Sequence, residues 1–203
     1  ARRLKFSAAY RDICQVLRHL ERLDDQNQQR AALGAGRPAS NKLSQSQVYS
    51  LSESVFFSAF RSLENFIEES FVLYSTGQPN LSGVSATSYL SSKSYERNRG
   101  IIKSTSQFVD WNSPEKVIER SKLFFKDGEP VKSVLVANTD LLRRMKRIRN
   151  HIAHNSEESV REFRKVVQQE LGVLPPRFPA PGEFLEMRIA RRDHNSFLRC
   201  YLK

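Results

Sequence analysis

Apolar residues recur at helical spacing in several segments of the chain, and polar stretches separate these segments. Residues 4–23 place most of their apolar side chains three or four positions apart, which predicts a first helix. Residues 24–47 are polar, include the turn-forming run GAGRP and predict a flexible connection. Residues 50–74 carry the longest helical pattern, which is typical of the central helix of a bundle. Its apolar face comprises Leu51, Val55, Phe56, Phe60, Leu63, Phe66, Ile67 and Phe71.

Irregular structure is predicted after this long helix. The run STGQPNLSG at 75–83 combines Gly, Pro, Asn and Ser, which favour turns, so we expect it to end the helix. Residues 84–110 are ambiguous, and we favour a helix there only from about Tyr95 to Phe108.

A helix start signal follows in the run WNSPEKVIERSKLFF. Ser113 can cap the first turn, Pro114 suits the first helical position, and Glu115 complements the positive end of the helix dipole. The run KDGEP at 126–130 is expected to end this helix. Residues 131–138, VKSVLVAN, form either a short extended piece or the approach to the next helix, and we predict no sheet from them.

Two consecutive helices are predicted from about Thr139 to Leu171. The first has a narrow apolar sector when about 100° per residue is counted round its axis. That sector comprises Leu141, Leu142, Met145, Ile148 and Ile152. Asn155 or Ser156 can cap the second helix, so His154 lies at the junction of the two. The second helix has an apolar stripe that comprises Val160, Phe163, Val166, Val167 and Leu171.

The chain ends in a proline-rich and then basic region. Residues 173–184, VLPPRFPAPGEF, are not expected to pack as regular structure, and a basic segment follows them. At 203 residues the chain suits one domain with a sizeable core, with or without an appendage. We therefore predict an all-α fold with long polar loops, in which residues 1–172 form a helical bundle and residues 173–203 form a linker and tail.

The charge of the chain narrows the classes of partner. Lys and Arg total 33 against 22 Asp and Glu, which gives a formal charge of +11 and an isoelectric point near 10.0. Such an excess favours polyanions, so nucleic acid is the leading partner class and an anionic membrane surface the second. No apolar run approaches the roughly 20 residues of a membrane span, so we expect no membrane insertion.

Cysteine usage and the first residues bear on the cellular setting. Cys14 and Cys200 are far apart, without the spacing of a disulfide framework or a zinc knuckle. The N-terminal residues lack the apolar core of a signal peptide. We expect a reducing, cytoplasmic setting. The chain begins at Ala1 rather than Met, so we expect it to be trimmed or to be part of a longer protein.

The first of the two late helices places polar side chains along the face opposite its apolar sector. These side chains are Arg143, Arg147, Asn150 and His154. Arg149 lies at the edge of the apolar sector, about 140° round the axis from His154 on an ideal helix. One straight helix therefore does not easily aim both residues at one phosphate. Two routes allow it: a break of the helix near Ala153, or a second copy of the chain that supplies half of the site.

These residue types suit cleavage of RNA without a metal or another cofactor. A histidine can take the proton of the ribose 2′-hydroxyl or protonate the leaving 5′-oxygen, which is worth roughly 10² to 10⁴ in rate. An arginine can hold the phosphate oxygens and stabilise the charge of the transition state. Asn150 could orient either group. The next helix N-terminus favours a bound phosphate, although Glu157 and Glu158 partly oppose it.

Simpler interpretations stay open for the same residues. Basic residues on a helix often form a solvated face, and an exposed or capping histidine is common at a helix end. The spacing of His151, His154 and Glu157 also permits a metal site, although zinc prefers more Cys or His ligands than lie nearby. Glu64 can pair with an arginine of residues 143–149, either as structural support or as a positioning group.

Trp111 and the phenylalanines at helical spacing are most simply core residues, with base stacking as the alternative. The sequence contains no P-loop, no G-x-S-x-G, no G-x-G-x-x-G and no H-E-x-x-H motif. These motifs carry most of the nucleotide-binding, hydrolytic and metalloprotease chemistry that a short motif can predict. The cluster of Arg, Asn and His around residues 143–154 is therefore the leading candidate for a functional site.

The segment Arg149-Asn150-His151-Ile152-Ala153-His154 resembles the R-x-x-x-x-H motif of the HEPN superfamily, in which a polar residue follows the arginine. The long helix with FRSLENFIEE at 60–69 precedes the motif in an all-helical chain, and this order also resembles HEPN domains of the bacterial toxin and phage-defence type. The likeness covers roughly residues 48–171. It implies a HEPN-like helical bundle that dimerises with the two motifs facing each other across a composite cleft.

The resemblance implies that Arg149 and His154 form the catalytic pair and that Asn150 is their polar companion. Many such domains are metal-independent endoribonucleases that leave a 2′,3′-cyclic phosphate and a 5′-hydroxyl. We therefore predict a homodimeric RNA endonuclease of a toxin or antiphage defence system that needs neither metal nor cofactor. An antitoxin or an associated defence protein is a further candidate partner. Additional contacts to RNA are expected from Arg143, Arg147 and His151.

Two alternatives stay open beside this prediction, because the family also contains non-catalytic members. The first is a basic helical module that binds nucleic acid or a partner protein without cutting it. The second is a helical scaffold whose charge only maintains solubility.

Overall fold

The computed structural model describes residues 43–79, 83–104, 109–188 and 196–201. Within these ranges the regular structure is helical, and only isolated β-bridges accompany the helices. The predicted all-α class is therefore confirmed for the described part of the chain. The helix predicted over residues 4–23 lies outside these ranges, as does most of the polar connection that follows it.

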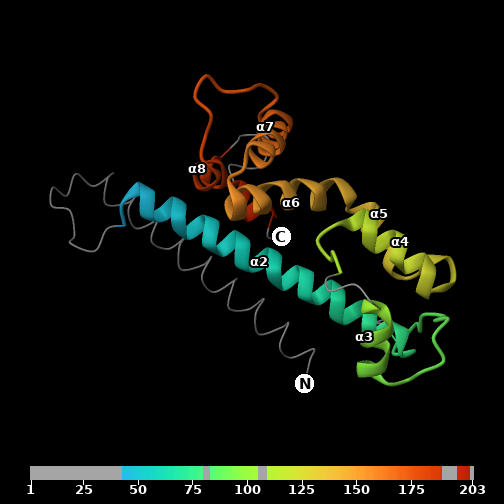
Figure 1. Cartoon of the computed structure of the whole chain (residues 1–203). Helices are drawn as coiled ribbons and strands as arrows, with labels where there is room; N and C mark the ends of the chain where they lie inside the picture. Colours follow the sequence, from blue (N-terminus) through green and yellow to red (C-terminus); the bar gives the residue numbers. More distant parts are fainter. Residues whose placement is uncertain (1–42, 80–82, 105–108, 189–195, 202–203) are drawn as a thin grey trace. The chain divides into compact units, whose positions relative to one another are not determined.

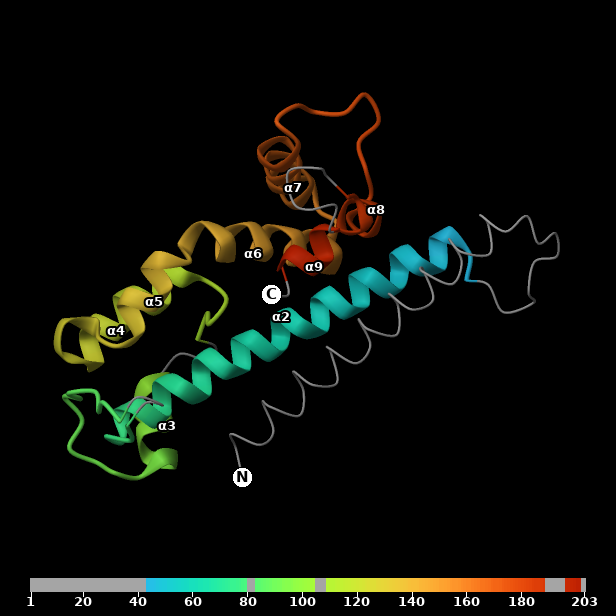
Figure 2. The same cartoon turned by 180° about the vertical axis from the view of Figure 1, so that it is seen from behind.

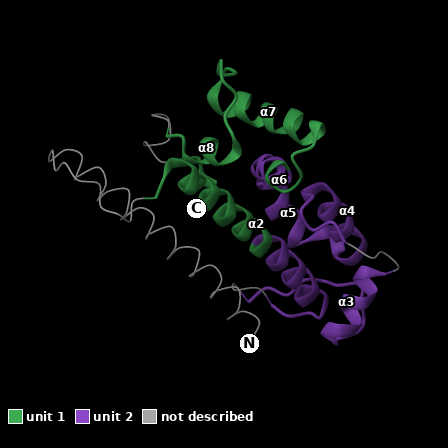
Figure 3. Cartoon of the chain, turned by 60° about the vertical axis from the view of Figure 1, so that its left-hand side comes forward, with its two compact units in different colours: residues 1–62, 151–203 green, residues 63–150 purple. Residues whose placement is uncertain are grey.

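Two compact units make up the chain, coloured green and purple in Figure 3. Unit 1 comprises residues 1–62 and 151–203, and unit 2 comprises residues 63–150. Two helices, α2 (Gln45–Ser75) and α6 (Thr139–His154), contribute residues to both units.

α2 is the long central helix that the sequence predicts over residues 50–74. It begins at Gln45, so the last residues of the predicted polar connection are helical. Most of the predicted apolar face is shielded from solvent, and Phe66 is an exception with 42% of its surface exposed. The fully or almost fully buried side chains of this face are Val55, Phe56, Phe60 and Phe71.

Unit 2 packs short helices against the C-terminal part of α2 (Figure 1). They are α3 (Tyr95–Lys103), α4 (Pro114–Phe124), the 3₁₀ turn η1 (Lys126–Gly128) and α5 (Val131–Ala137). The ring centroid of Phe71 lies 5.3 Å from that of Trp111 and 4.9 Å from that of Phe125. Trp111 is 8% exposed, so the prediction that it is a core residue is confirmed.

The local signals that bound α4 are confirmed. Ser113 occupies the N-cap position, although its hydroxyl donates to the Glu115 carboxylate at 3.1 Å and makes no hydrogen bond to the backbone of the first turn. α4 ends at Phe124, where the backbone of Phe125 is extended, and the run KDGEP, in which Asp127 and Gly128 have positive φ, does not continue it as an α-helix. For residues 131–138, both an extended piece and a helix were open, and residues 131–137 form the helix α5.

α3 begins at Tyr95 as predicted and ends at Lys103, earlier than expected. Residues 105–108, the remainder of that predicted helix, lie outside the described ranges. The side chain of Asn98 is fully buried and ties α3 to the end of α2, because its Nδ2 atom donates to the Ser75 backbone oxygen at 3.1 Å.

Unit 1 contains α7 (Glu157–Leu171), α8 (Pro181–Glu186) and α9 (Phe197–Tyr201). α8 and α9 lie side by side in both Figure 1 and Figure 2. Aromatic rings form the centre of this unit, with ring centroids 5.4 Å apart for Phe163 and Phe184 and 4.4 Å apart for Phe184 and Phe197. The predicted stripe of α7 is confirmed, and its buried members are Phe163, Val166 and Val167.

The prediction that residues 173–184 lack regular structure is wrong at their C-terminal end, where α8 begins. A proline suits the first turn of a helix, so a proline-rich composition does not by itself exclude one. Phe184 is fully buried, and Gly182 lies so close to α2 that a Cβ atom there would be 2.4 Å from the Tyr49 backbone oxygen. The Gly182 amide also donates to Glu53 Oε1 at 2.8 Å. Part of the predicted linker and tail therefore packs inside unit 1.

Candidate functional site

α6 carries most of the predicted site residues and is helical through His154. The break near Ala153, one of the two routes considered above, does not occur before His154. The chain turns one residue after the helix ends, at Asn155, whose φ of 43° lies in the left-handed region that asparagine tolerates. Ser156, one of the two residues predicted as a cap, then caps α7, and its hydroxyl oxygen accepts a hydrogen bond from the Ser159 amide at 3.3 Å.

The R-x-x-x-x-H segment spans the boundary between the two units. That boundary falls between Asn150 and His151, so Arg149 belongs to unit 2 and His154 belongs to unit 1. The contacts of Arg149 are therefore described within unit 2, and those of His154 within unit 1.

Arg149 contacts both Glu64 and Asn150 within unit 2. Its Nη2 atom lies 3.9 Å from Glu64 Oε1, and its Nη1 atom donates to Asn150 Oδ1 at 3.3 Å. The Arg149 and Glu64 side chains are only 19% and 17% exposed. The prediction that Glu64 pairs with an arginine of residues 143–149 is confirmed. Asn150, predicted to orient a catalytic group, contacts the guanidinium itself.

His154 is the last residue of α6, and its side chain is exposed at the corner between α6 and α7. The predicted position of His154 at a junction between helices is confirmed. Glu157 and Glu158 occupy the first turn of α7 and are exposed as well. Their negative charges counteract the attraction that a helix N-terminus has for phosphate, as the sequence predicts.

His151 is directed into unit 1 and is 7% exposed. Its ring stacks on Phe163 with centroids 4.9 Å apart and an interplanar angle of 24°, and its Nδ1 atom lies 3.2 Å from Ser159 Oγ. The Ser159 hydroxyl donates its only hydrogen to the Ser156 backbone oxygen at 2.8 Å, so it can only accept from His151. His151 therefore carries a hydrogen on Nδ1.

Burial lowers the pKa of His151, because the charged imidazolium loses its hydration. The neutral imidazole is therefore the favoured form near neutral pH. The predicted role of His151 in binding nucleic acid does not fit this placement, because its ring is committed to packing and its Nδ1 atom to a serine. The metal site that the spacing of His151, His154 and Glu157 permits is not assembled, since no group of three or more His, Cys, Asp or Glu side chains suited to a metal occurs among the described residues.

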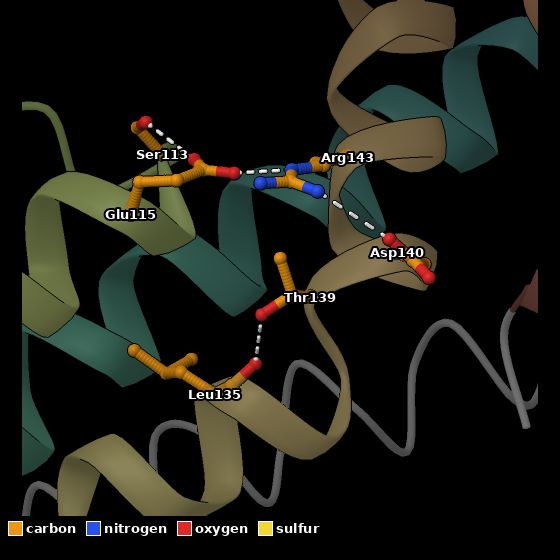
Figure 4. Close-up of polar contacts among 6 residues, drawn as sticks. All are labelled: Ser113, Glu115, Leu135, Thr139, Asp140 and Arg143. Carbon is orange, nitrogen blue, oxygen red and sulfur yellow. Dashed lines mark hydrogen bonds and ion pairs between the residues drawn. The ribbon is translucent and has the colours of Figure 1, made fainter.

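Arg143, predicted to contact RNA, is half exposed near the start of α6. It pairs with Glu115 of α4, and its Nη1 atom lies 3.4 Å from Asp140 Oδ1 (Figure 4). The Thr139 hydroxyl donates to the Leu135 backbone oxygen at 2.7 Å and so ties the start of α6 to α5 (Figure 4). Ion pairs this exposed contribute little and exchange readily, so Arg143 is accessible to an incoming phosphate.

Arg147, the other arginine predicted to contact RNA, is half-buried on α6. Two further basic residues of unit 2 share one carboxylate: Lys116 Nζ lies 3.0 Å and Lys146 Nζ lies 3.6 Å from Asp110 Oδ2. The sequence did not predict that acids of residues 110–115 face the basic residues of α6, because the partners are far apart along the chain and share no periodic pattern.

The positive charge of unit 2 is concentrated on α6. Residues 63–150 contain 14 Lys and Arg against 10 Asp and Glu, and residues 139–150 contain five Lys and Arg against one Asp. The remainder of unit 2 therefore has equal numbers of both signs, and α6 accounts for its whole excess of four positive charges. A polyanion that approaches this unit is attracted to this helix.

None of the helices in the described ranges is both long and apolar enough to cross a membrane. Comparisons of this chain with protein families, curated proteins and solved structures found no match. The residues of α6 and their contacts therefore carry the functional argument.

Proposed function

We propose that this protein is a metal-independent endoribonuclease of the HEPN type, acting in a toxin or antiphage defence system. The observation that carries this function is the state of Arg149, whose guanidinium is restrained by Glu64 and Asn150 while His154 is exposed at the end of the same helix. A restrained arginine and an accessible histidine can supply the charge stabilisation and the proton transfer that RNA cleavage requires once both meet one phosphate.

The chemistry follows from the functional groups. The ribose 2′-oxygen attacks the adjacent phosphorus atom and loses its proton, the bond from phosphorus to the 5′-oxygen breaks, and the leaving oxygen takes up a proton. The products are a 2′,3′-cyclic phosphate and a 5′-hydroxyl. His154 transfers a proton at one of the two oxygens, and Arg149 stabilises the extra negative charge on the phosphate in the transition state.

A second copy of the chain is expected to complete the site. α6 stays helical through His154, and residues five positions apart on an ideal helix point about 140° away from each other. A break of α6 before His154, the alternative route to convergence, is absent. In a two-fold symmetric dimer, Arg149 of one copy can meet His154 of the other, and each copy contributes to two equivalent sites.

The second candidate function is a non-catalytic module that binds nucleic acid or a partner protein through α6. The concentration of positive charge on this helix supports binding whether or not cleavage follows. Partners proposed for either function are RNA, a second copy of the chain, and an antitoxin or associated defence protein. The proposed setting is the cytoplasm, where such RNA targets occur.

Cleavage of a single-stranded RNA in the presence of EDTA separates the two functions. The parent protein, Arg149→Ala and His154→Ala are compared at equal concentration, with Lys122→Ala as a control for an exposed basic residue on α4. We expect the parent and the control to cleave, and each motif variant to lose at least about 10²-fold in rate. Absence of cleavage by the parent, or equal cleavage by both motif variants and the parent, would reject the nuclease function.

Two controls test the mechanism and the assembly. A DNA strand of matching sequence lacks the attacking 2′-hydroxyl, so we expect it to be bound and left intact. Cleaved DNA would contradict the cyclising mechanism. Sizing chromatography over a range of protein concentrations is expected to reveal a dimer, and a strict monomer would contradict the shared site.

A further inference from the structure

Glu64 lies on α2 and Arg149 on α6, so their ion pair connects two helices of unit 2 at the predicted catalytic arginine. Among the ion pairs of the described residues, this pair has both partners less than one-fifth exposed. The pairs of Arg143 with Glu115 and of Lys116 with Asp110 lie much closer to solvent. Water screens the Glu64–Arg149 pair less than these surface pairs, so the Glu64 charge acts on Arg149 more strongly.

The contact between Glu64 and Arg149 is electrostatic and not a short hydrogen bond. The Nη2 to Oε1 distance of 3.9 Å exceeds hydrogen-bonding distance, and the buried Oε1 atom of Glu64 accepts no hydrogen bond from the described part of the chain. A buried carboxylate in this state depends on a nearby positive charge. Glu64 therefore attracts the guanidinium without locking it.

One helical turn further along α2, Glu68 offers the opposite arrangement. Its side chain is also 17% exposed, but its Oε1 atom lies 2.9 Å from both Nε and Nη2 of Arg99. This short double contact is the geometry expected of a structural ion pair. The longer Glu64–Arg149 contact differs in the way expected if the arginine also has to bind something else.

Asn150 restrains the guanidinium from a second direction, because its Oδ1 atom accepts from Arg149 Nη1. Neighbours at two different nitrogens restrain the orientation of the guanidinium more than either neighbour alone. A phosphate that binds Arg149 can compete with the Glu64 charge, because the Glu64 contact is longer than a hydrogen bond.

We propose that Glu64 is a positioning residue for the predicted nuclease reaction, holding Arg149 in the orientation that stabilises the transition state. This inference rests on the proposed function. Loss of the Glu64 charge leaves the guanidinium less well aimed at the transition state, so kcat falls. It also removes a negative charge beside the phosphate, so RNA binding is unchanged or tighter.

The test compares Glu64→Gln with Glu68→Gln, which removes the same charge from the same helix at the same exposure but away from Arg149. We expect Glu64→Gln to lower kcat for RNA cleavage about tenfold or more, with KM unchanged or lower, and Glu68→Gln to keep kcat within about twofold of the parent. Glu64→Asp keeps the charge on a shorter side chain, and we expect it to recover part of the lost kcat.

Binding of an RNA with a 2′-deoxy group at the cleavage position separates positioning from misfolding. A correctly folded Glu64→Gln protein binds this uncleavable RNA with the stoichiometry of the parent. A stoichiometry that falls in proportion to kcat would overturn the inference, because the loss would then reflect unfolded protein. Should Glu64→Gln cleave as fast as the parent, or should Glu68→Gln lose as much activity, positioning by Glu64 is wrong.

The inference and the proposed function fail in different ways. Cleavage by the parent and its loss in Arg149→Ala, together with full activity of Glu64→Gln, would leave the nuclease function standing and remove the role of Glu64. A parent that does not cleave RNA would remove both.

Discussion

Different kinds of interaction surround His154 and Arg149, the two predicted catalytic residues. In unit 1, the corner that presents His154 is held by uncharged groups, because the buried ring of His151 stacks on Phe163 and hydrogen-bonds to a serine. In unit 2, Arg149 is held by the opposite charge of Glu64 across a distance too long for a hydrogen bond.

This difference determines how each half of the proposed site can be disturbed. A neutral, packed corner responds to lost packing volume and to a change in the protonation of its histidine. A charge-restrained arginine responds to removal of the carboxylate and to competing anions. The histidine half therefore depends on the folding of unit 1, while the arginine half can change its orientation without unfolding of unit 2.

The largest effect is expected from Phe163→Ala. Phe163 is fully buried and contacts His151 and Phe184, so truncation is expected to cost about 3–5 kcal/mol of stability. Hydrogen exchange followed along α7, combined with urea unfolding, measures this loss. Phe71→Ala is the matched change in unit 2, and its loss of protection is expected at α4 and Trp111. If both variants reduce the protection of α7 equally, the packing of unit 1 and that of unit 2 are not independent, which would contradict the comparison.

A smaller effect is expected from Asn155→Ala, at the turn between α6 and α7. The φ of 43° is unfavourable for residues with a Cβ atom, and asparagine tolerates it better than alanine does. We expect Asn155→Ala to lower the free energy of unfolding by about 1 kcal/mol, while Asn155→Gly stays close to the parent. If alanine is as stable as glycine at this position, the corner is not maintained by this backbone conformation.

Acidification is expected to loosen the histidine half. Because burial lowers the pKa of His151 in the folded protein, the unfolded chain binds the proton more readily below the ordinary value of 6.5. The stability from this group is complete above that value and is lost as the pH falls through the folded pKa. The midpoint temperature of thermal unfolding should therefore fall as the pH is lowered from 8 to 5. This fall should be smaller in His151→Gln. His154→Gln is the control, and an equal reduction in both variants would contradict this assignment.

The smallest effect is expected from Arg143→Ala on α6. Arg143 is half exposed and pairs with surface carboxylates, so it can contribute one phosphate contact. We expect RNA affinity to fall by less than about tenfold. The slope of the logarithm of affinity against the logarithm of salt concentration should become shallower by about one. The rate of cleavage of fully bound RNA should not change. A large loss of that rate would move Arg143 into the reacting site.

Local signals made much of the helical fold predictable. The period of apolar residues placed α2 and α7, and the serine cap placed the corner that follows His154, because both depend on residues close together in the sequence. The prediction for the proline-rich segment is wrong at α8, because the burial of Phe184 depends on residues far away along the chain.

The candidate site was predictable only in part, for the same reason. The sequence predicts that Glu64 can pair with an arginine of α6, whereas the pairing of Arg143 with Glu115 joins residues that share no periodic pattern. The burial of His151 left one signal in the sequence. Ser159 lies four residues before Phe163, so it is expected on the buried side of α7, where its hydroxyl can accept a hydrogen bond from a buried polar side chain.

Mixing two inactive variants tests the shared site most directly. Arg149→Ala and His154→Ala are each inactive in the proposed account, but a dimer that contains one copy of each retains one intact arginine–histidine pair. After exchange of subunits at equal concentrations, we predict RNA cleavage at about a quarter of the parent rate, since half of the dimers are mixed and each has one of two sites intact. No recovery on mixing, with dimers shown to exchange, would contradict a site built from two copies of the chain.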